Sequence, residues 1–241
     1  MAKQNPHITT TSSQGFVSKN DVFRNRANSR FSRCRQVLVN SQGGVGSSAF
    51  MELLQKNHVL MNSPEDVDGF KHRPADHFRH DSDGIYLFGR FACASKALVI
   101  LGDPLHSIES VYRRFSVDHI NKWREYAQKP PYHRRTRLAD LWAEMRILRQ
   151  DTTGLTNYIN SWLRAKNEPT WPQLRLVTTK SLYEHAADHA KFLGVREENL
   201  LPFKQLAYNP RPFRSSAPAD VQAMFGPIKV KIDQLEASSD S

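Results

Sequence analysis

The sequence predicts an α/β fold in which a central, mainly parallel sheet lies between two layers of helices. A glycine-rich turn joins a short β-branched run at 37–40 to an apolar, helix-forming stretch at 49–55. The continuous aliphatic run at 97–101 is typical of a parallel strand that is buried on both faces. Segments with helical periodicity separate the predicted strands, and this order implies β-α-β crossovers.

Predicted strands and helices follow one another along the chain. Buried apolar runs predict strands at 37–40, 58–61, 85–88, 97–101 and 174–178. Apolar residues at helical spacing predict helices at 49–55, 105–115, 138–149, 156–164 and 183–193, the last of which ends at Gly194. No internal repeat accompanies this order, so a single α/β domain is expected.

The length and composition predict one globular domain. The chain has 241 residues, which is enough to bury a sizeable core. Its two cysteines, Cys34 and Cys93, form neither a disulfide framework nor a metal-binding spacing, and this fits a reducing compartment. No apolar run approaches the roughly 20 residues that span a bilayer. We therefore expect a cytoplasmic protein with one domain at 35–236 and a flexible tail at 237–241.

Residues 1–34 differ in composition from the rest of the chain. The net charge is +10, and residues 1–36 carry +6 of it among many Ser, Thr, Asn and Gln side chains. This composition predicts a basic, disordered arm. An organellar transit peptide is the alternative, because such peptides are also rich in Arg and Ser and poor in acids. Few aromatic residues interleave the basic ones, so the arm does not favour nucleic acid as a partner.

The glycine-rich turn has the composition of an anion-binding loop. Three glycines, Gly43, Gly44 and Gly46, let main-chain N–H groups converge without interference from Cβ atoms. The N-terminus of the following helix adds partial positive charge at the same point. Phosphate or sulfate suits such a site, and a tight turn that binds nothing is the alternative.

The loop departs from the phosphate loop of ATPases and GTPases. When the pattern Gly-x-x-x-x-Gly-Lys-Ser/Thr is aligned on Gly46, Ser41 replaces the first glycine and Ser47 replaces the lysine. The lysine normally reaches the β- and γ-phosphates, so its loss argues against a kinase or NTPase. No clear acidic residue for a magnesium ion follows an aliphatic strand, because Asp103 leads directly into proline.

Three segments together resemble the sulfotransferases that use 3′-phosphoadenosine 5′-phosphosulfate (PAPS). Asp103-Pro104 followed by Ser110 is similar to the motif with which that family binds the 3′-phosphate. The loop at 41–48 lies where the family has its 5′-phosphosulfate loop. The segments 174–177, 182–183 and 192–195 resemble the family's late strand, short helix and closing Phe-Leu-Gly. The resemblance spans residues 36–195 and implies a P-loop-containing nucleotide-binding fold.

The resemblance also implies the roles of individual residues. His72, within Lys71-His72-Arg73-Pro74, corresponds to the general base, and Lys71 accompanies it in catalysis. An imidazole with a pKa of about 6.5 is suited to remove a proton near neutral pH. The resemblance implies that PAPS, and its product PAP, are held by Ser41, Gln42, Gly43, Gly44, Val45, Gly46, Ser47, Ser48, Asp103, Ser110, Arg114 and Arg211. No metal is expected in this scheme.

Two departures from the family leave alternatives open. Gly102 occupies the position of the family's arginine, and the glycine loop lacks its usual lysine or arginine. Arg114, one helical turn beyond Ser110, is a candidate to replace the lost charge. The resemblance implies transfer of a sulfuryl group to a hydroxyl or amine of a small-molecule or carbohydrate acceptor. A catalytically inactive nucleotide- or anion-binding protein of the same fold is the alternative. The sequence does not predict the oligomeric state.

Overall fold

The structure is a computed structural model that describes residues 36–81, 84–86, 94–168, 173–209 and 212–237. Its contacts divide the chain into Met1–Arg33 and Cys34–Ser241, and the fold described below belongs to the second unit. The basic arm predicted at 1–34 and the candidate ligand contact Arg211 lie outside the described residues.

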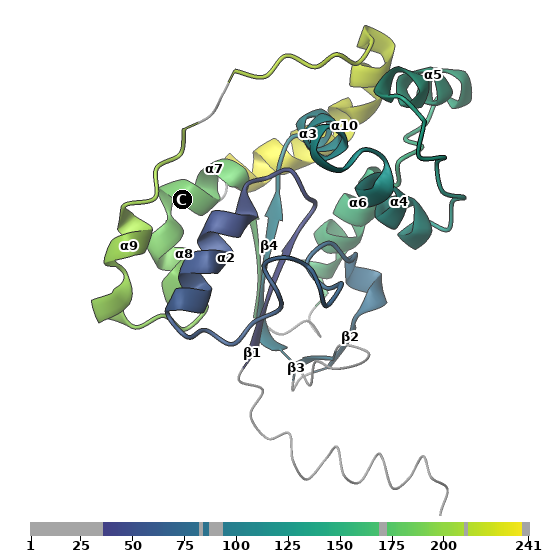
Figure 1. The fold of residues 1–241 in the computed structure, drawn as a ribbon. Coiled ribbons are helices and arrows are strands. Elements are labelled where there is room, and N and C mark those ends of the chain that lie inside the picture. Colours follow the sequence, from purple (N-terminus) through teal and green to yellow (C-terminus); the bar gives the residue numbers. More distant parts are fainter. Residues whose placement is uncertain (1–35, 82–83, 87–93, 169–172, 210–211, 238–241) are drawn as a thin grey trace, which may run out of the picture. The chain divides into compact units, whose positions relative to one another are not determined.

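The described residues form a mixed α/β fold (Figure 1). The strands are β1 (Gln36–Ser41), β2 (Arg79–Asp81), β3 (Gly84–Tyr86), β4 (Ala94–Leu101) and β5 (Gln173–Thr178). The α-helices are α2 (Ser47–Lys56), α3 (Pro104–Phe115), α4 (Asp118–Tyr126), α5 (Leu138–Leu148), α6 (Leu155–Ala165), α7 (Thr179–Glu184), α8 (Ala186–Phe192), α9 (Leu201–Lys204) and α10 (Ala219–Ala237). Two short 3-10 helices are η1 (Ala75–His77) and η2 (Glu197–Asn199).

The sheet has a small, open parallel centre. Strand β4 pairs in parallel with β1 on one side and with β5 on the other, so that Leu98 lies opposite both Val39 and Arg175. This confirms the parallel arrangement predicted for 37–40, 97–101 and 174–178. Strand β3 differs, because it forms an antiparallel hairpin with β2 and meets β4 through the pair Ile85 and Ala94.

Side chains alternate between two hydrophobic cores, one on each face of the sheet. Leu38, Val99 and Leu176 point into a core shared with α3, α4, α5, α6 and α10. Val39 and Ile100 point into a second core shared with α2, α7, α8 and α9. Figure 1 shows α2 and α8 on one side of β1 and β4, and α6 on the other. The aliphatic run at 97–101 is completely buried, as expected for a strand that is covered on both faces.

Two predicted elements differ from the structure, and two of its long helices were not predicted. The segment 58–61 does not form a full strand, because it meets β1 only through a single bridge between Met61 and Val37. The predicted helix at 183–193 is two helices, α7 and α8, that meet at His185. Helix α4 was not predicted because its sequence is mostly polar. Helix α10 was not predicted either, and it contains Pro227, although proline usually interrupts a helix. Among the described residues, no helix is long and apolar enough to cross a membrane.

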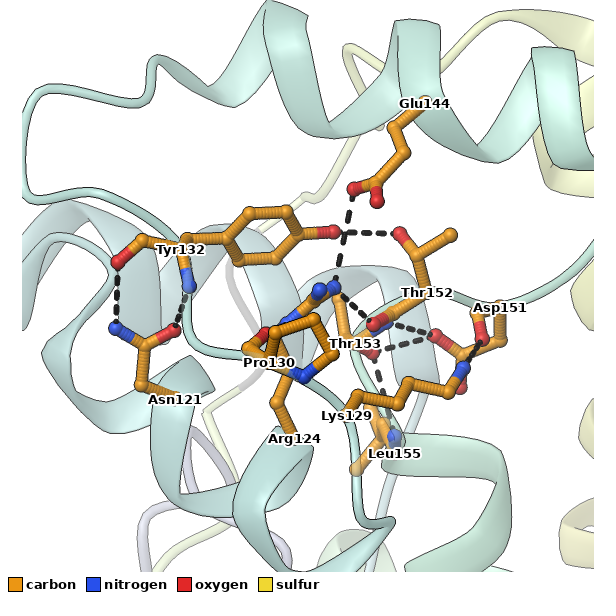
Figure 2. Close-up of polar contacts among 10 residues, drawn as sticks. All are labelled: Asn121, Arg124, Lys129, Pro130, Tyr132, Glu144, Asp151, Thr152, Thr153 and Leu155. Carbon is orange, nitrogen blue, oxygen red and sulfur yellow. Dashed lines mark hydrogen bonds and ion pairs between the residues drawn. The ribbon is translucent and has the colours of Figure 1, made fainter.

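A buried polar cluster anchors the C-terminal half of α4 (Figure 2). The guanidinium of Arg124 donates to the main-chain oxygens of Pro130 (2.5 Å) and Thr152 (2.6 Å) and lies 3.7 Å from the centre of the Tyr132 ring. The hydroxyl of Tyr132 hydrogen bonds to that of Thr152 over 2.6 Å. The cluster thus joins α4 to the connections on either side of α5, and α4 carries three residues that line the candidate site.

Candidate functional site

The candidate site lies at the carboxyl ends of β1 and β4. Strand β1 is followed by α2 on one face of the sheet, and its neighbour β4 is followed by α3 on the other face. Such a switch point opens a crevice between the two helices, where ligands bind in open α/β sheets. A cavity of about 410 Å³ lies here, lined by Gly43, Gly44, Gly46, Ser47, Ser48, Glu52, Pro64, Glu65, Asp66, Lys71, His72, Val111, Arg114, Phe115, Asp118, His119 and Lys122.

The three loop glycines are held in a left-handed conformation. The φ angles of Gly43, Gly44 and Gly46 are 86°, 71° and 70°. A Cβ atom on Gly44 would lie 3.0 Å from the Cα atom of Ser107, so only glycine lets the loop approach α3 this closely. Tyr183, from α7, donates to the main-chain oxygen of Gly46 over 2.6 Å and fixes the end of the loop.

The remaining loop residues divide between the cavity and the interior. Ser47 and Ser48 line the cavity at the N-terminus of α2, where no side chain caps the helix. The hydroxyls of Ser41 and Ser47 hydrogen bond over 3.1 Å. Ser41 and Val45 are buried and do not line the cavity.

The side chain of Gln42, a candidate ligand contact, binds within the protein. Its Nε2 atom donates to the main-chain oxygen of Gly102 (2.9 Å) and to the hydroxyl of Ser107 (2.6 Å). The residue is completely buried. Gln42 therefore connects the glycine loop to the start of α3, and its side chain does not reach the cavity.

Lys71 brings a cation to the loop from another part of the chain. Its Nζ atom donates to the hydroxyl of Ser48 (3.2 Å) and to the main-chain oxygen of Pro64 (2.6 Å). The side chain is buried, and burial is the main cause that lowers its pKa, although Asp66 and Glu65 act in the opposite direction. The amine thus lies at the N-terminus of α2, close to the serine that follows the missing loop lysine.

His72 lines the same cavity with one ring nitrogen fixed. Its Nδ1 atom lies 2.6 Å from the main-chain oxygen of Ser41. Because a carbonyl oxygen only accepts, Nδ1 carries the proton and Nε2 is left as the acceptor of the neutral ring. Burial lowers the pKa of His72 to about 3, against the effect of the bond to Ser41. The expectation of an ordinary histidine pKa is therefore wrong, because the ring is almost completely removed from water.

Asn40 attaches the segment that carries Lys71 and His72 to the end of β1. Its Nδ2 atom donates to the main-chain oxygens of Phe70 (2.8 Å) and Arg73 (2.9 Å). Its Oδ1 atom accepts from the hydroxyl of Tyr158. Since Asn40 is completely buried, these bonds hold the segment on both sides of the two candidate catalytic residues.

The predicted 3′-phosphate motif is divided by the structure. Asp103 caps α3 by accepting from the main-chain N–H of His106 (2.9 Å) and pairs with Lys229 (3.2 Å), outside the cavity lining. Ser110 lies beside Gly44, and Arg114 reaches back one turn to donate to its hydroxyl over 3.3 Å. Arg114 therefore brings a cation to the cavity, whereas neither Asp103 nor Ser110 is among the residues that line it.

Gly102 has no room for the family's arginine. A Cβ atom at this position would lie 2.8 Å from Cγ1 of Val45 and 2.9 Å from Oγ1 of Thr179. The end of β4 is therefore packed directly against the glycine loop and the start of α7. This close packing explains why a glycine occupies the position.

Helix α4 supplies three lining residues that the sequence did not indicate, and two of them contact other lining residues. The ring of His119 lies against that of His72, with centroids 4.3 Å apart and planes at 70°. Lys122, one turn later, pairs with the buried carboxylate of Asp66 over 2.9 Å. The signal was the spacing of His119, Lys122 and Trp123, which places all three on one face of a helix. The helix itself was not predicted, so this spacing was not recognised.

The charges around the cavity are mixed. Lys71, Arg114 and Lys122 are the lining cations, and the lining acids are Glu52, Glu65, Asp66 and Asp118. Lys122 and Asp66 neutralise each other, so the cations beside the loop are Lys71 and Arg114. Among the described residues, no group of three or more His, Cys, Asp and Glu side chains is placed to hold a metal ion.

The chain was compared with protein-family models, with curated proteins and with solved structures, and none of the three comparisons gave a significant match.

Proposed function

We propose that this protein transfers a sulfuryl group from PAPS to a hydroxyl or amine of a small-molecule or carbohydrate acceptor. The observation that carries the proposal is the meeting of His72, Lys71 and the glycine loop at one cavity. We further propose that the domain is a divergent three-layer fold of the P-loop nucleotide-binding type. The helices on both faces of the parallel strands support this assignment.

The chemistry of the cavity wall fits a phosphosulfate group. The left-handed φ angles of Gly43, Gly44 and Gly46 give the loop the kind of turns in which successive main-chain N–H groups bind an anion. Lys71 and Arg114 supply positive charge from either side of the loop. We assign the 5′-phosphosulfate to the loop and Lys71, and a second phosphate to Ser110 and Arg114.

His72 fits the role of general base in this scheme. Its Nε2 atom accepts the proton of the acceptor hydroxyl or amine as that oxygen or nitrogen forms a bond to sulfur. The bond between sulfur and the bridging oxygen of the 5′-phosphate breaks, and PAP leaves with that electron pair. The carbonyl of Ser41 holds the tautomer, and Lys71 faces the negative charge that develops on the leaving phosphate.

A binding protein that does not transfer the group is the second candidate. Two observations favour it. The packing at Gly102 excludes the arginine that the family uses, and burial weakens His72 as a base by lowering its pKa to about 3. Binding of PAP alone would then be the whole activity.

The deciding experiment compares the parent with the variant His72→Asn. Asparagine retains an N–H donor for the carbonyl of Ser41 but provides no base at the position of Nε2. We expect PAP to bind both proteins with similar affinity in calorimetry, whereas transfer from labelled PAPS falls by at least about 100-fold. Equal turnover in the two proteins would remove His72 from the mechanism. Tight binding of PAP without transfer to any acceptor in a broad panel would favour the binding protein.

A further inference from the structure

We infer that His119 is a positioning residue, which fixes the plane of the His72 ring so that Nε2 faces the cavity. This inference rests on the proposed role of His72 as the base. It adds a second histidine, from a helix outside the motifs that carry the family resemblance, to the residues on which that role depends.

One hydrogen bond and one ring contact orient the imidazole of His72. The hydrogen bond to Ser41 fixes which nitrogen of His72 carries the proton. One hydrogen bond alone still allows the plane of the ring to tilt. The ring of His119 lies 4.3 Å away, centroid to centroid, with its plane at 70° to that of His72. An edge-to-face contact at this distance restricts the tilt that the hydrogen bond permits.

His119 is itself held in place by its neighbours. A Cβ atom on Gly43 would lie 3.0 Å from Nε2 of His119, 3.2 Å from Val111 and 3.5 Å from the ring of Trp123. These three side chains therefore close around the first glycine of the loop. The rings of His119 and Trp123 are also in edge-to-face contact, with centroids 5.5 Å apart. The next residue, Arg124, anchors the helix through its polar cluster (Figure 2).

His119 packs through its ring against His72, Phe115 and Trp123. Its Nε2 atom is buried and has no hydrogen-bond partner among the described residues. This atom therefore contributes no hydrogen bond that holds the ring, and a phenylalanine ring can make the same packing contacts. Burial lowers the pKa of His119 to about 2, and the neighbouring His72 acts in the same direction. Both rings are therefore neutral at pH 7, and neither repels the other.

The test measures the orientation of His72 directly and uses the full chain. In protein labelled with ¹⁵N-histidine, the nitrogen shifts distinguish the two neutral tautomers, and the variant His72→Asn identifies the signals of His72. We expect the parent to show the Nδ1–H tautomer of His72. The variant His119→Leu, which keeps a similar volume without a flat ring, should mix the two tautomers. It should also lower kcat by about tenfold or more while the affinity for PAP changes little.

Two further variants separate positioning from other roles. His119→Phe keeps a flat ring and should restore both the His72 signals and most of kcat. His133→Ala removes an exposed histidine outside the cavity and should change neither. Unchanged His72 signals in a folded His119→Leu protein would overturn the inference. So would a loss of kcat in His119→Phe with the His72 signals intact, because His119 would then act through its own nitrogen. The spectra require no PAPS, so failure of sulfuryl transfer in the parent would sink the proposed function separately.

Discussion

The imidazole of His72 donates through Nδ1 to the main-chain oxygen of Ser41, over 2.6 Å. Ser41 is the last residue of β1, and the glycine loop begins immediately after it. The main-chain N–H of Ser41 in turn donates to the oxygen of Lys71 over 2.7 Å. The segment that carries the candidate base and the loop that carries the candidate anion site are thus joined at one residue. A change at the end of β1 is expected to affect both.

The first prediction concerns Gly44. In Gly44→Ala the new Cβ atom would meet the main chain of Ser107 at 3.0 Å while the backbone stays at φ 71°, so the loop must move. We expect the affinity for PAP to fall by at least about tenfold, or about 1.4 kcal/mol, in calorimetry. The control is Gly194→Ala, which carries a similar backbone strain at φ 99° but has nothing within 4 Å of the new atom. Equal losses of affinity in the two variants would contradict a role for the loop.

The second prediction concerns the charge supplied by Lys71. Lys71→Met keeps most of the buried volume but removes the amine that lies 3.2 Å from Ser48. Because hydrogen bonds to charged groups contribute about 1.5–3 kcal/mol, the affinity for PAP should fall by about 10- to 100-fold. Arg113→Met removes an exposed cation from α3 that does not line the cavity, and it should have little effect. An equal loss of PAP affinity in both variants would show that binding depends on the overall charge of the protein and not on the position of Lys71.

The third prediction is a loss of stability in acid. Burial lowers the pKa of His72 to about 3, that of His119 to about 2 and that of His189 to about 4, compared with about 6.5 in the unfolded chain. The unfolded state therefore binds more protons than the native state below pH 6.5. The stabilisation is fully present above that pH and is lost progressively as the pH falls to the native pKa values of about 4 for His189, 3 for His72 and 2 for His119. Each histidine contributes a slope of about 1.4 kcal/mol per pH unit in this range.

Urea unfolding at pH 7, 6 and 5 measures this slope. The double variant His72→Asn/His119→Phe should show a shallower decrease than the parent, because two of the three protons are no longer taken up. A free energy of unfolding that stays constant between pH 7 and pH 5 would show that these rings are not buried in solution.

Local patterns carried the centre of the fold. The aliphatic run at 97–101 and the β-branched run at 37–40 are buried on both faces. A continuous apolar run predicts a strand of this kind, so the sequence pattern and the observed burial agree. Helix α4 was missed because its sequence is polar and its apolar contacts come from only a few residues, such as Ile120 and Trp123. Tertiary contacts, including the Arg124 cluster, supply what the local pattern lacks.

The sequence indicated site residues only where they belong to the glycine loop itself or to a recognisable motif. Gly43, Gly44, Lys71, His72 and Arg114 line one cavity, and their roles in binding stay a prediction. Asp103 is instead used to cap α3, because an aspartate before a helix satisfies its free N–H groups. His119 comes from a helix outside the motifs, and only the fold brings its ring to His72.

The last prediction concerns Gly102, where the family resemblance requires an arginine. A Cβ atom here would lie 2.8 Å from Val45 and 2.9 Å from Thr179, so even a methyl group overfills the junction between the loop and β4. Overpacking of this kind costs about 1–3 kcal/mol, and we expect Gly102→Ala to lower the free energy of unfolding by that amount. Gly226→Ala is the control, since nothing lies within 4 Å of its new atom and alanine favours the helix by about 0.5–1 kcal/mol.

A double variant identifies the contact responsible for the effect of Gly102. Val45→Ala removes the methyl group that the new Cβ atom would meet, so Gly102→Ala should cost less in a Val45→Ala background than in the parent. The two changes are in direct contact and should therefore not be additive. Urea unfolding of the parent, the two single variants and the double variant measures the coupling. If the losses in the free energy of unfolding are additive, the contact with Val45 is not the cause of the effect of Gly102→Ala. Tighter binding of PAP by Gly102→Arg than by the parent would show that the loop can move aside and admit the family's arginine.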